Sequence, residues 1–357
     1  MNRLLKIPTL LFLAALFCGC AETAVSRDRY FWPRPPERPR LEWLGAYSSQ
    51  LDLQVTAKRK VKWVLVGEDP PITFATPMDI KSDGNGRIFV SDPAKSSVFI
   101  YDMNMSEVRI LPRKHDETRL RQPISVALDG EGRLYIADSW LNLVLVYDSL
   151  EEFKGIINIK RHVKRVSSIA VDRTRKRLLV ADPGEHKIKV FNLSGEFQFE
   201  FGGHGEADGQ FSYPIALTVN LAGEIVVADA MNARIQIFDG SGRFLRKFGS
   251  RGSGIGDFQL IKGVATDSDN NIYVTDGRTH RLLIFSTTGE FLLPVGGMYS
   301  IASRKVAPGG FVLPQGVDVD RNDTIYVVDQ MNKRFQVFQY LTDKYLREHP
   351  VQEKLWP

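Results

Sequence analysis

The feature that most constrains this chain is a six-fold internal repeat. Two positions recur, the first held by an acid or its amide and the second by Asp, each closing a run of apolar and β-branched residues. The second lies nine residues after the first in every copy except the third, where it lies ten after. The first position is occupied by Asp83, Asp129, Asp172, Asn220, Asp267 and Asp320, and the second by Asp92, Asp138, Asp182, Asp229, Asp276 and Asp329. An aromatic residue follows nine residues after each second position. One spacing in six copies indicates a repeat architecture.

Each copy contains several short strands. The runs that end in the second acid, such as 87–92 and 133–138, are rich in β-branched and aromatic residues and are preceded by turn residues. In the fourth copy, further strands are expected at 234–238 and 244–249. Four strands in a repeat of this length form one blade of a β-propeller. The sequence therefore predicts an all-β fold, a six-bladed β-propeller of four-stranded antiparallel blades spanning 41–357.

A propeller must close its ring, because an open sheet edge leaves backbone hydrogen-bonding groups unpaired. The segment 41–47, Leu-Glu-Trp-Leu-Gly-Ala-Tyr, is a lone strand candidate before the first repeat. We expect it to join the sixth blade and to tie the start of the chain to its end.

The residues around the two acids follow a common pattern in the later copies. The fourth copy reads Ala-Asp-Ala-Met-Asn-Ala-Arg-Ile-Gln-Ile-Phe at 228–238, and the sixth has Gly-Val-Asp-Val-Asp at 316–320 and Asn-Lys-Arg-Phe-Gln-Val-Phe at 332–338. This pattern resembles that of the NHL-repeat family. The resemblance covers about 76–345, although the first three copies lack the Asn and Arg of the pattern. It implies a six-bladed propeller and says little about function, since one fold serves many functions.

The first residues look like an export signal. Arg3 and Lys6 precede an apolar run at 7–17 that is too short to span a bilayer, which is typical of a signal peptide over 1–19. The end of the run resembles the lipobox of bacterial lipoproteins, with Gly19 before Cys20. That resemblance implies lipidation of Cys20 and a lipid anchor in the bacterial cell envelope, in the outer membrane facing the periplasm. A plain cleaved leader or an uncleaved anchor remains an alternative.

The segment 20–40 is predicted to be a lipidated, proline-rich tether. Its prolines favour an extended polyproline conformation. The aromatic residues at 30–32 could sit at a membrane interface, but packing under the propeller is the favoured placement for them.

Composition narrows the function classes. Both cysteines, Cys18 and Cys20, precede the repeats, so the predicted propeller contains no disulfide framework and no cysteine-based metal motif. A net charge of +5 over 357 residues is small, and with export it argues against nucleic acid as a partner.

The repeated acids are predicted to be structural. One acid per blade at a fixed place fits a side chain that accepts hydrogen bonds from the following turn. No cofactor and no metal is expected. His186 and His280, each four residues after its second acid, are weak candidates for a divalent metal such as calcium or zinc. Such a metal in the central channel would belong to the alternative function, a propeller enzyme of the lyase or lactonase type.

The loops after the second strands are expected to share one face of the disc with the connections between blades. A tryptophan at a loop tip beside a basic arc suits a protein-binding surface, because Trp and Arg are favoured interface anchors. The candidate binding face comprises Trp140, Leu141, Arg234, Arg278, His280, Arg281 and Arg334. In the alternative interpretation the tryptophan folds over its own blade and the arginines bind neighbouring loops. For Arg234, Arg281 and Arg334 this structural role is the favoured one.

The main hypothesis is therefore an envelope lipoprotein that acts as a binding or scaffold module through one propeller face. Its partner is expected to be an envelope protein or polymer, and the chain is expected to be a monomer. A sensor of small ligands is neither supported nor excluded by the sequence.

Overall fold

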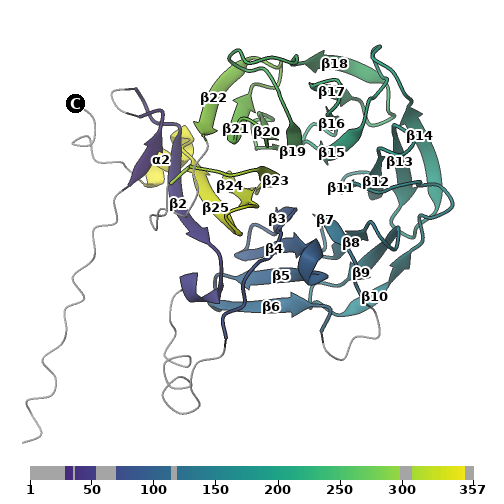
Figure 1. The fold of residues 1–357 in the computed structure, drawn as a ribbon, viewed down its shortest axis with the longest axis horizontal. Helices are drawn as coiled ribbons and strands as arrows, with labels where there is room; N and C mark the ends of the chain where they lie inside the picture. Colours follow the sequence, from purple (N-terminus) through teal and green to yellow (C-terminus); the bar gives the residue numbers. More distant parts are fainter. Residues whose placement is uncertain (1–28, 35–36, 54–69, 114–118, 298–307, 350–357) are drawn as a thin grey trace, which may run out of the picture.

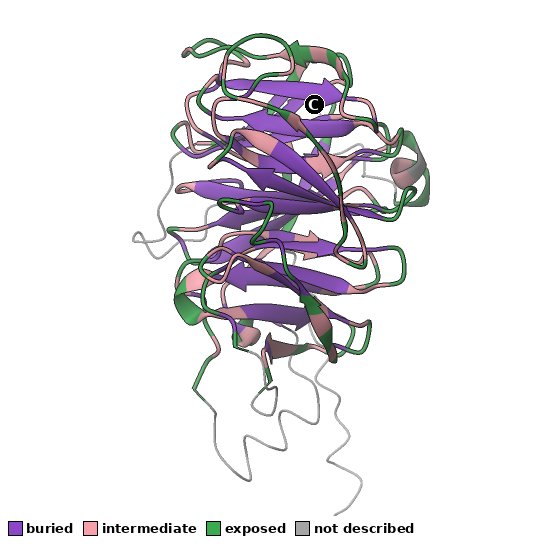
Figure 2. Ribbon diagram, turned by 90° about the vertical axis from the view of Figure 1, so that its right-hand side faces the viewer, coloured by how far each residue is buried: buried purple, intermediate pink, exposed green. Residues whose placement is uncertain are grey.

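The computed structural model describes residues 29–34, 37–53, 70–113, 119–297 and 308–349. Six antiparallel sheets stand like blades around one axis (Figure 1), and from the side the molecule is a disc with its buried strands stacked through the middle (Figure 2). The signal peptide expected at 1–19 and the lipidation expected at Cys20 lie outside the described residues.

Every blade is built from the strands that the repeat predicts, numbered outward from the axis. The innermost strands are β3 (Ile80–Ser82), β7 (Pro123–Leu128), β11 (Ser168–Asp172), β15 (Pro214–Val219), β19 (Ile261–Thr266) and β23 (Pro314–Val319). The second strands, each ending at the second acid of its copy, are β4 (Arg87–Asp92), β8 (Leu134–Asp138), β12 (Arg177–Asp182), β16 (Ile225–Asp229), β20 (Ile272–Asp276) and β24 (Thr324–Asp329).

The outer half of each blade follows the same order. The third strands are β5 (Ser97–Asp102), β9 (Leu143–Tyr147), β13 (Lys187–Asn192), β17 (Arg234–Phe238), β21 (Arg281–Phe285) and β25 (Arg334–Tyr340). The fourth strands of the first five blades are β6 (Glu107–Leu111), β10 (Phe153–Ile157), β14 (Phe197–Gly202), β18 (Phe244–Phe248) and β22 (Phe291–Gly296). The predicted six-bladed fold is confirmed.

The sixth blade takes its fourth strand from the other end of the chain. Strand β2 (Leu41–Tyr47) pairs antiparallel with β25, and Trp43 lies opposite Phe338. The predicted closure by 41–47 is therefore confirmed. Strand β1 (Tyr30–Trp32) pairs with β2 in turn, so this blade has five strands rather than four.

The aromatic residues at 30–32 pack against the propeller, which was the favoured placement for them rather than a membrane interface. Residues 30–32 lie inside the segment 20–40 that was expected to be an extended linker, yet they add a strand to the sheet. Phe31 is buried, and the ring of Trp32 packs edge-on against Phe338 at 5.7 Å between centroids. Burial of aromatic surface gives this short segment a reason to dock despite the prolines that follow it.

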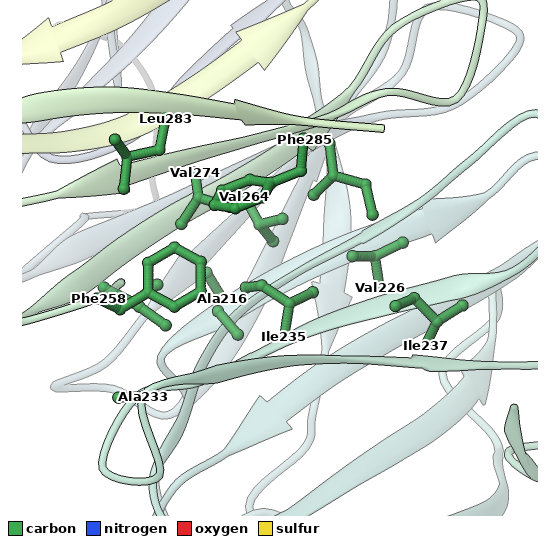
Figure 3. Close-up of a cluster of buried hydrophobic side chains, with 13 residues drawn as sticks. Ala216, Val226, Ala233, Ile235, Ile237, Phe258, Val264, Val274, Leu283 and Phe285 are labelled. Carbon is green, nitrogen blue, oxygen red and sulfur yellow. The ribbon is translucent and has the colours of Figure 1, made fainter. Parts of the chain in front are cut away.

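The core is divided into six clusters, one between each pair of neighbouring blades. In Figure 3 the cluster between the fourth and fifth blades shows Ile235 and Val226 facing Val264, Phe258 and neighbouring side chains of the fifth blade. The second strands are covered on both faces, so strands such as β8 and β20 are buried along their whole length. This burial explains why they read as continuous apolar runs rather than as alternating patterns.

Glycine is required where three of the fourth strands end. Gly202, Gly249 and Gly296 have φ angles of 102°, 91° and 101°. A Cβ atom on Gly249 would lie 2.3 Å from the ring of Phe258, which is fully buried in the connection to the next blade. Only a residue without a side chain allows this close approach at positive φ.

Helical structure is minor among the described residues. It consists of two short 3-10 turns, η1 (Gln50–Asp52) and η2 (Pro93–Lys95), and the helix α2 (Asp343–Glu348), which is capped by Thr342. No helix in the described ranges is both long enough and apolar enough to cross a membrane.

The two faces of the disc have different loops. On the upper face the innermost strands begin and the second strands end, as shown by the pairing of Pro214 with Asp229. The lower face carries the turns between first and second strands, where Val219 pairs with Ile225.

Candidate functional site

The second acid of each blade is a structural group on the upper face. All six are fully buried. Asp276 accepts four backbone hydrogen bonds, from Gln259 at 2.6 Å and Leu260 at 3.1 Å in the connection between blades, and from Arg278 at 3.0 Å and Thr279 at 2.9 Å in its own loop. The carboxylate thus joins the loop after the second strand to the connection that enters the same blade. The predicted structural role of this acid is confirmed.

The first acid closes the turn on the lower face. Asp129 accepts hydrogen bonds at 2.9 Å from the backbone N–H groups of Glu131 and Arg133. Asp267 makes the same pair of bonds to Asp269 and Asn271. This is the geometry of an Asx turn, so these acids accept hydrogen bonds from the following turn as predicted.

All six upper loops share one backbone conformation. The residue four places after each second acid has a φ between 50° and 57°, in the left-handed region. These residues are Ser96, Asn142, His186, Ala233, His280 and Lys333. His186 and His280 therefore recur because they occupy the same turn position, which accepts histidine better than most residues.

The two histidines bind backbone across the boundary between blades. Nδ1 of His186 accepts the N–H of Tyr213 at 3.1 Å, and Nδ1 of His280 accepts the N–H of Leu313 at 3.0 Å. Burial, and then the neighbouring ring of His204 at 4.6 Å, lower the pKa of His186. Each histidine thus fixes the residue before the innermost strand of the next blade. Within the described residues, no three His, Cys, Asp or Glu side chains are grouped to hold a metal ion.

Two of the candidate arginines lie inside the protein. Arg234 donates to Asp229 at 2.8 Å and to the backbone oxygens of Glu206, Ala207 and Gln210. Arg334 donates to its own blade's second acid and to a carbonyl of the connection between blades in the same way. The connection between blades supplies carbonyl acceptors to both guanidinium groups, and both side chains are buried. The structure thus removes Arg234 and Arg334 from the candidate binding face.

The other candidates remain at the upper surface. Arg278 and Arg281 are exposed, Leu141 and His280 are half-buried, and Trp140 is 76% exposed. The tryptophan does not fold over its own blade, which was the alternative interpretation. Its loop is well fixed, because Asp138 accepts the backbone N–H groups of Trp140 at 3.0 Å and Leu141 at 2.9 Å.

The tips of the upper loops show a pattern that the sequence reading missed. The residue two places after each second acid is, in blade order, Ala94, Trp140, Gly184, Met231, Arg278 and Met331. Large apolar side chains thus stand at alternate blades, and Met231 and Met331 are 54% and 62% exposed. The same repeat spacing that located the acids would have located these residues.

The axis of the disc holds two chambers lined by the innermost strands of all six blades. The upper chamber has a volume of about 380 Å³ and the lower chamber about 290 Å³. Five residues before each first acid, one side chain per blade lines the upper chamber: Met78, Ile124, Ser167, Ile215, Lys262 and Gln315. This ring was also missed, although the repeat spacing marks it. The described lining of both chambers contains no histidine.

An ion pair separates the two chambers on the side of the first blade. Lys81 lines both and donates to Asp318 of the sixth blade at 2.9 Å. Burial acts to lower the pKa of Lys81, but the carboxylates of Asp318 and Asp79 outweigh it and leave the pKa above its ordinary value. Asp79 in turn accepts a hydrogen bond from Ser125 of the second blade at 2.7 Å. These contacts make this wall a closed polar network between neighbouring blades.

Comparison with known proteins gives the fold and little more. A family model described as a six-bladed β-propeller matches residues 261–353. No curated protein matches the chain. A protein of unknown function from Bacteroides thetaiotaomicron superposes with a TM-score of 0.58 at 16% identity, covering 74% of this chain and 70% of that one.

Two solved structures of other proteins are similarly related. Virginiamycin B lyase from Staphylococcus aureus gives a TM-score of 0.53 at 12% identity, covering 78% of this chain and 86% of the lyase. Hydrazine synthase from Kuenenia stuttgartiensis superposes with a TM-score of 0.53 at 13% identity, covering 78% of this chain and 99% of that one. At such identities the likeness is one of fold. Together with the ring of six sheets, these matches show that the chain is a six-bladed β-propeller.

Proposed function

We propose that this protein is a binding propeller of the NHL-repeat type, held at the bacterial envelope by a lipid on Cys20, that captures an envelope protein on its upper face. The observation that carries the proposal is the set of three exposed apolar tips, Trp140, Met231 and Met331, on alternate blades of one face. Trp and Met are enriched at the surfaces where proteins bind one another, and here they recur at one repeat position of a single face.

The chemistry of the tips favours a protein over a polymer. Trp, Met and Arg are enriched where proteins bind one another. The loop of Trp140 is already fixed by two backbone hydrogen bonds to Asp138. Little conformational entropy is then lost on binding, which favours affinity.

Charge on the same face indicates the kind of surface that would fit it. Arg278, Arg281 and Lys333 are exposed on the fifth and sixth blades. A partner with an apolar protrusion bordered by acidic residues would complement the tips and these cations. Such complementarity raises the association rate and the specificity more than the final affinity.

The proposed anchor suits a free upper face. Strand β1 is the outermost strand of the sixth blade, so a tether from Cys20 would reach the disc at its rim. Nine positions separate Cys20 from Arg29, a reach of about 30 Å when fully extended. Attachment at the rim leaves both faces of the disc uncovered.

The alternative, a lyase or lactonase with calcium or zinc in the channel, requires convergent ligands around a metal. No specific contact in the described lining favours it. The fold likeness to a virginiamycin B lyase is shared by proteins of other functions.

The proposal is tested by affinity capture from envelope extracts with matched variants. The triple variant Trp140→Ala, Met231→Ala, Met331→Ala should capture at least ten-fold less protein than the unchanged chain, because it lacks the apolar anchors. Leu221→Ala, at a 77% exposed apolar residue on the lower face, is the control and should capture as the unchanged chain does.

Two results would contradict the proposal. One is equal capture by the triple variant and the unchanged chain. The other is capture of a polymer that survives digestion of all protein in the extract, which would reassign the upper face to a polymer.

A further inference from the structure

The upper chamber has the dimensions of a small-molecule site. Its volume of about 380 Å³ lies in the range of ligand pockets. Apolar side chains such as Ile215 and Val264 share the lining with serine, glutamine and tyrosine groups. A few polar groups in a partly apolar hollow is the usual composition of such a site.

The charges in the chamber are not balanced. Lys81 is paired with Asp318, whereas Lys262 on β19 and the guanidinium of Arg165 before β11 form no ion pair with any described carboxylate. Arg165 donates instead to the phenol oxygen of Tyr213 at 3.1 Å. Two uncompensated cations therefore line the third and fifth blades, with Tyr213 of the fourth blade between them in the ring.

The lack of a counter-charge affects Lys262 most. Burial lowers the pKa of its ammonium group, which means that its charged form lacks solvation or a counter-charge. Among the described residues that line this chamber, Asp79 on the first blade is the one carboxylate, and it accepts hydrogen bonds from Ser125 and from the backbone of Val126. An anion in the chamber would be repelled by Asp79 and drawn to the side of Lys262 and Arg165.

Neutral groups in the chamber retain hydrogen-bonding capacity. The hydroxyl of Tyr213 accepts from Arg165, which leaves its proton to donate. Gln122 uses its side-chain oxygen to accept from Ser139, and Gln315 uses its nitrogen to donate to Gln330. The amide nitrogen of Gln122 and the amide oxygen of Gln315 remain to bind hydroxyl groups of a ligand.

We infer that the upper chamber binds a small hydroxylated carboxylate, whose carboxylate group meets Lys262 and Arg165 and whose hydroxyl groups meet Tyr213, Gln122 and Gln315. This site is separate from the protein surface proposed above, because its ligand lies within the ring rather than on the loop tips. The bound anion supplies the counter-charge that Lys262 lacks.

The inference is tested by calorimetric titration of the purified full-length chain with three probes. D-glucuronate carries both a carboxylate and hydroxyl groups, D-glucose lacks the carboxylate, and hexanoate lacks the hydroxyl groups. D-glucuronate should bind at least ten-fold more tightly than either of the others. Lys262→Gln and Arg165→Gln should each weaken its binding at least ten-fold.

Lys95→Gln, at an exposed lysine in an upper loop outside the chamber, is the matched control and should bind D-glucuronate unchanged. Arg165 is largely exposed, so its variant keeps the test valid if Lys262→Gln does not fold. The inference is overturned if D-glucuronate does not bind at millimolar concentration, if D-glucose or hexanoate binds equally well, or if both chamber variants bind as the control does. None of these results depends on whether a protein partner is captured by the loop tips.

Discussion

At the scale of single residues, buried acids hold the loops of this propeller in place. Each second acid accepts backbone hydrogen bonds from a connection that precedes its blade's inner strand, and each lies at the end of a fully paired strand. Charge-assisted bonds of this kind are stronger than neutral ones. The carboxylate oxygens are therefore occupied by backbone hydrogen bonds and are not available to bind a metal or a partner at the upper face.

Asp276 offers the sharpest test of this role. Asp276→Ala leaves four backbone N–H groups without their acceptor, so we expect the free energy of unfolding to fall by about 3 kcal/mol or more. Urea unfolding measures the change. Asp208→Ala, at an exposed acid paired with Lys247, is the control and should cost at most about 1 kcal/mol. Equal stability of the two variants would show that the buried carboxylate is not a structural tie.

Sequence spacing located these acids because each of the six blades has the same loop, whose backbone N–H groups need an acceptor at the same position. It included Arg234 and Arg334 among the binding-face candidates while favouring a structural role for both, and their burial and bonds to backbone carbonyl groups bear out the structural role. It also missed Lys262, because one polar residue in an apolar strand has no meaning until the strand is known to line a chamber.

At the scale of elements, the ring depends on a strand that is remote in sequence from its partner. Strand β2 covers the edge of β25, and Leu41 is fully buried in the cluster between the fifth and sixth blades. A lone strand with a clear apolar pattern sufficed to predict this closure. Strand β1 was not predicted, because three residues before a proline-rich segment give too short a pattern to assign.

Two substitutions in β2, one buried and one exposed, test how this strand packs. Leu41→Ala should lower the free energy of unfolding by about 2–5 kcal/mol, because it leaves a cavity between two blades. Leu44→Ala on the same strand changes a residue that is 40% exposed and should change the stability by about 0.5 kcal/mol or less. Thermal unfolding followed by circular dichroism compares the two. A similar loss in both variants would mean that β2 does not pack against the fifth and sixth blades as described.

At the scale of the whole molecule, the two faces are unlike. The lower face is built of tight turns held by Asx geometry, and exposed apolar residues such as Leu221 occur there too. The upper face presents apolar tips at one repeat position of alternate blades and several cations around the opening of the upper chamber. The number of blades and the paths of their strands followed from the repeat. The difference between the faces required the structure, because exposure depends on how six loops are brought around one axis.

The central claim, that the upper face captures a protein, is tested most directly by site-specific photo-crosslinking in intact cells. A photoreactive amino acid is placed either at Met331 on an upper tip or at Leu221 on the lower face, both exposed. We predict a discrete crosslinked protein from position 331 and none from position 221, with the crosslink lost when Trp140→Ala and Met231→Ala are added. Crosslinks of equal yield from both positions, or a discrete product from position 221 alone, would contradict the account.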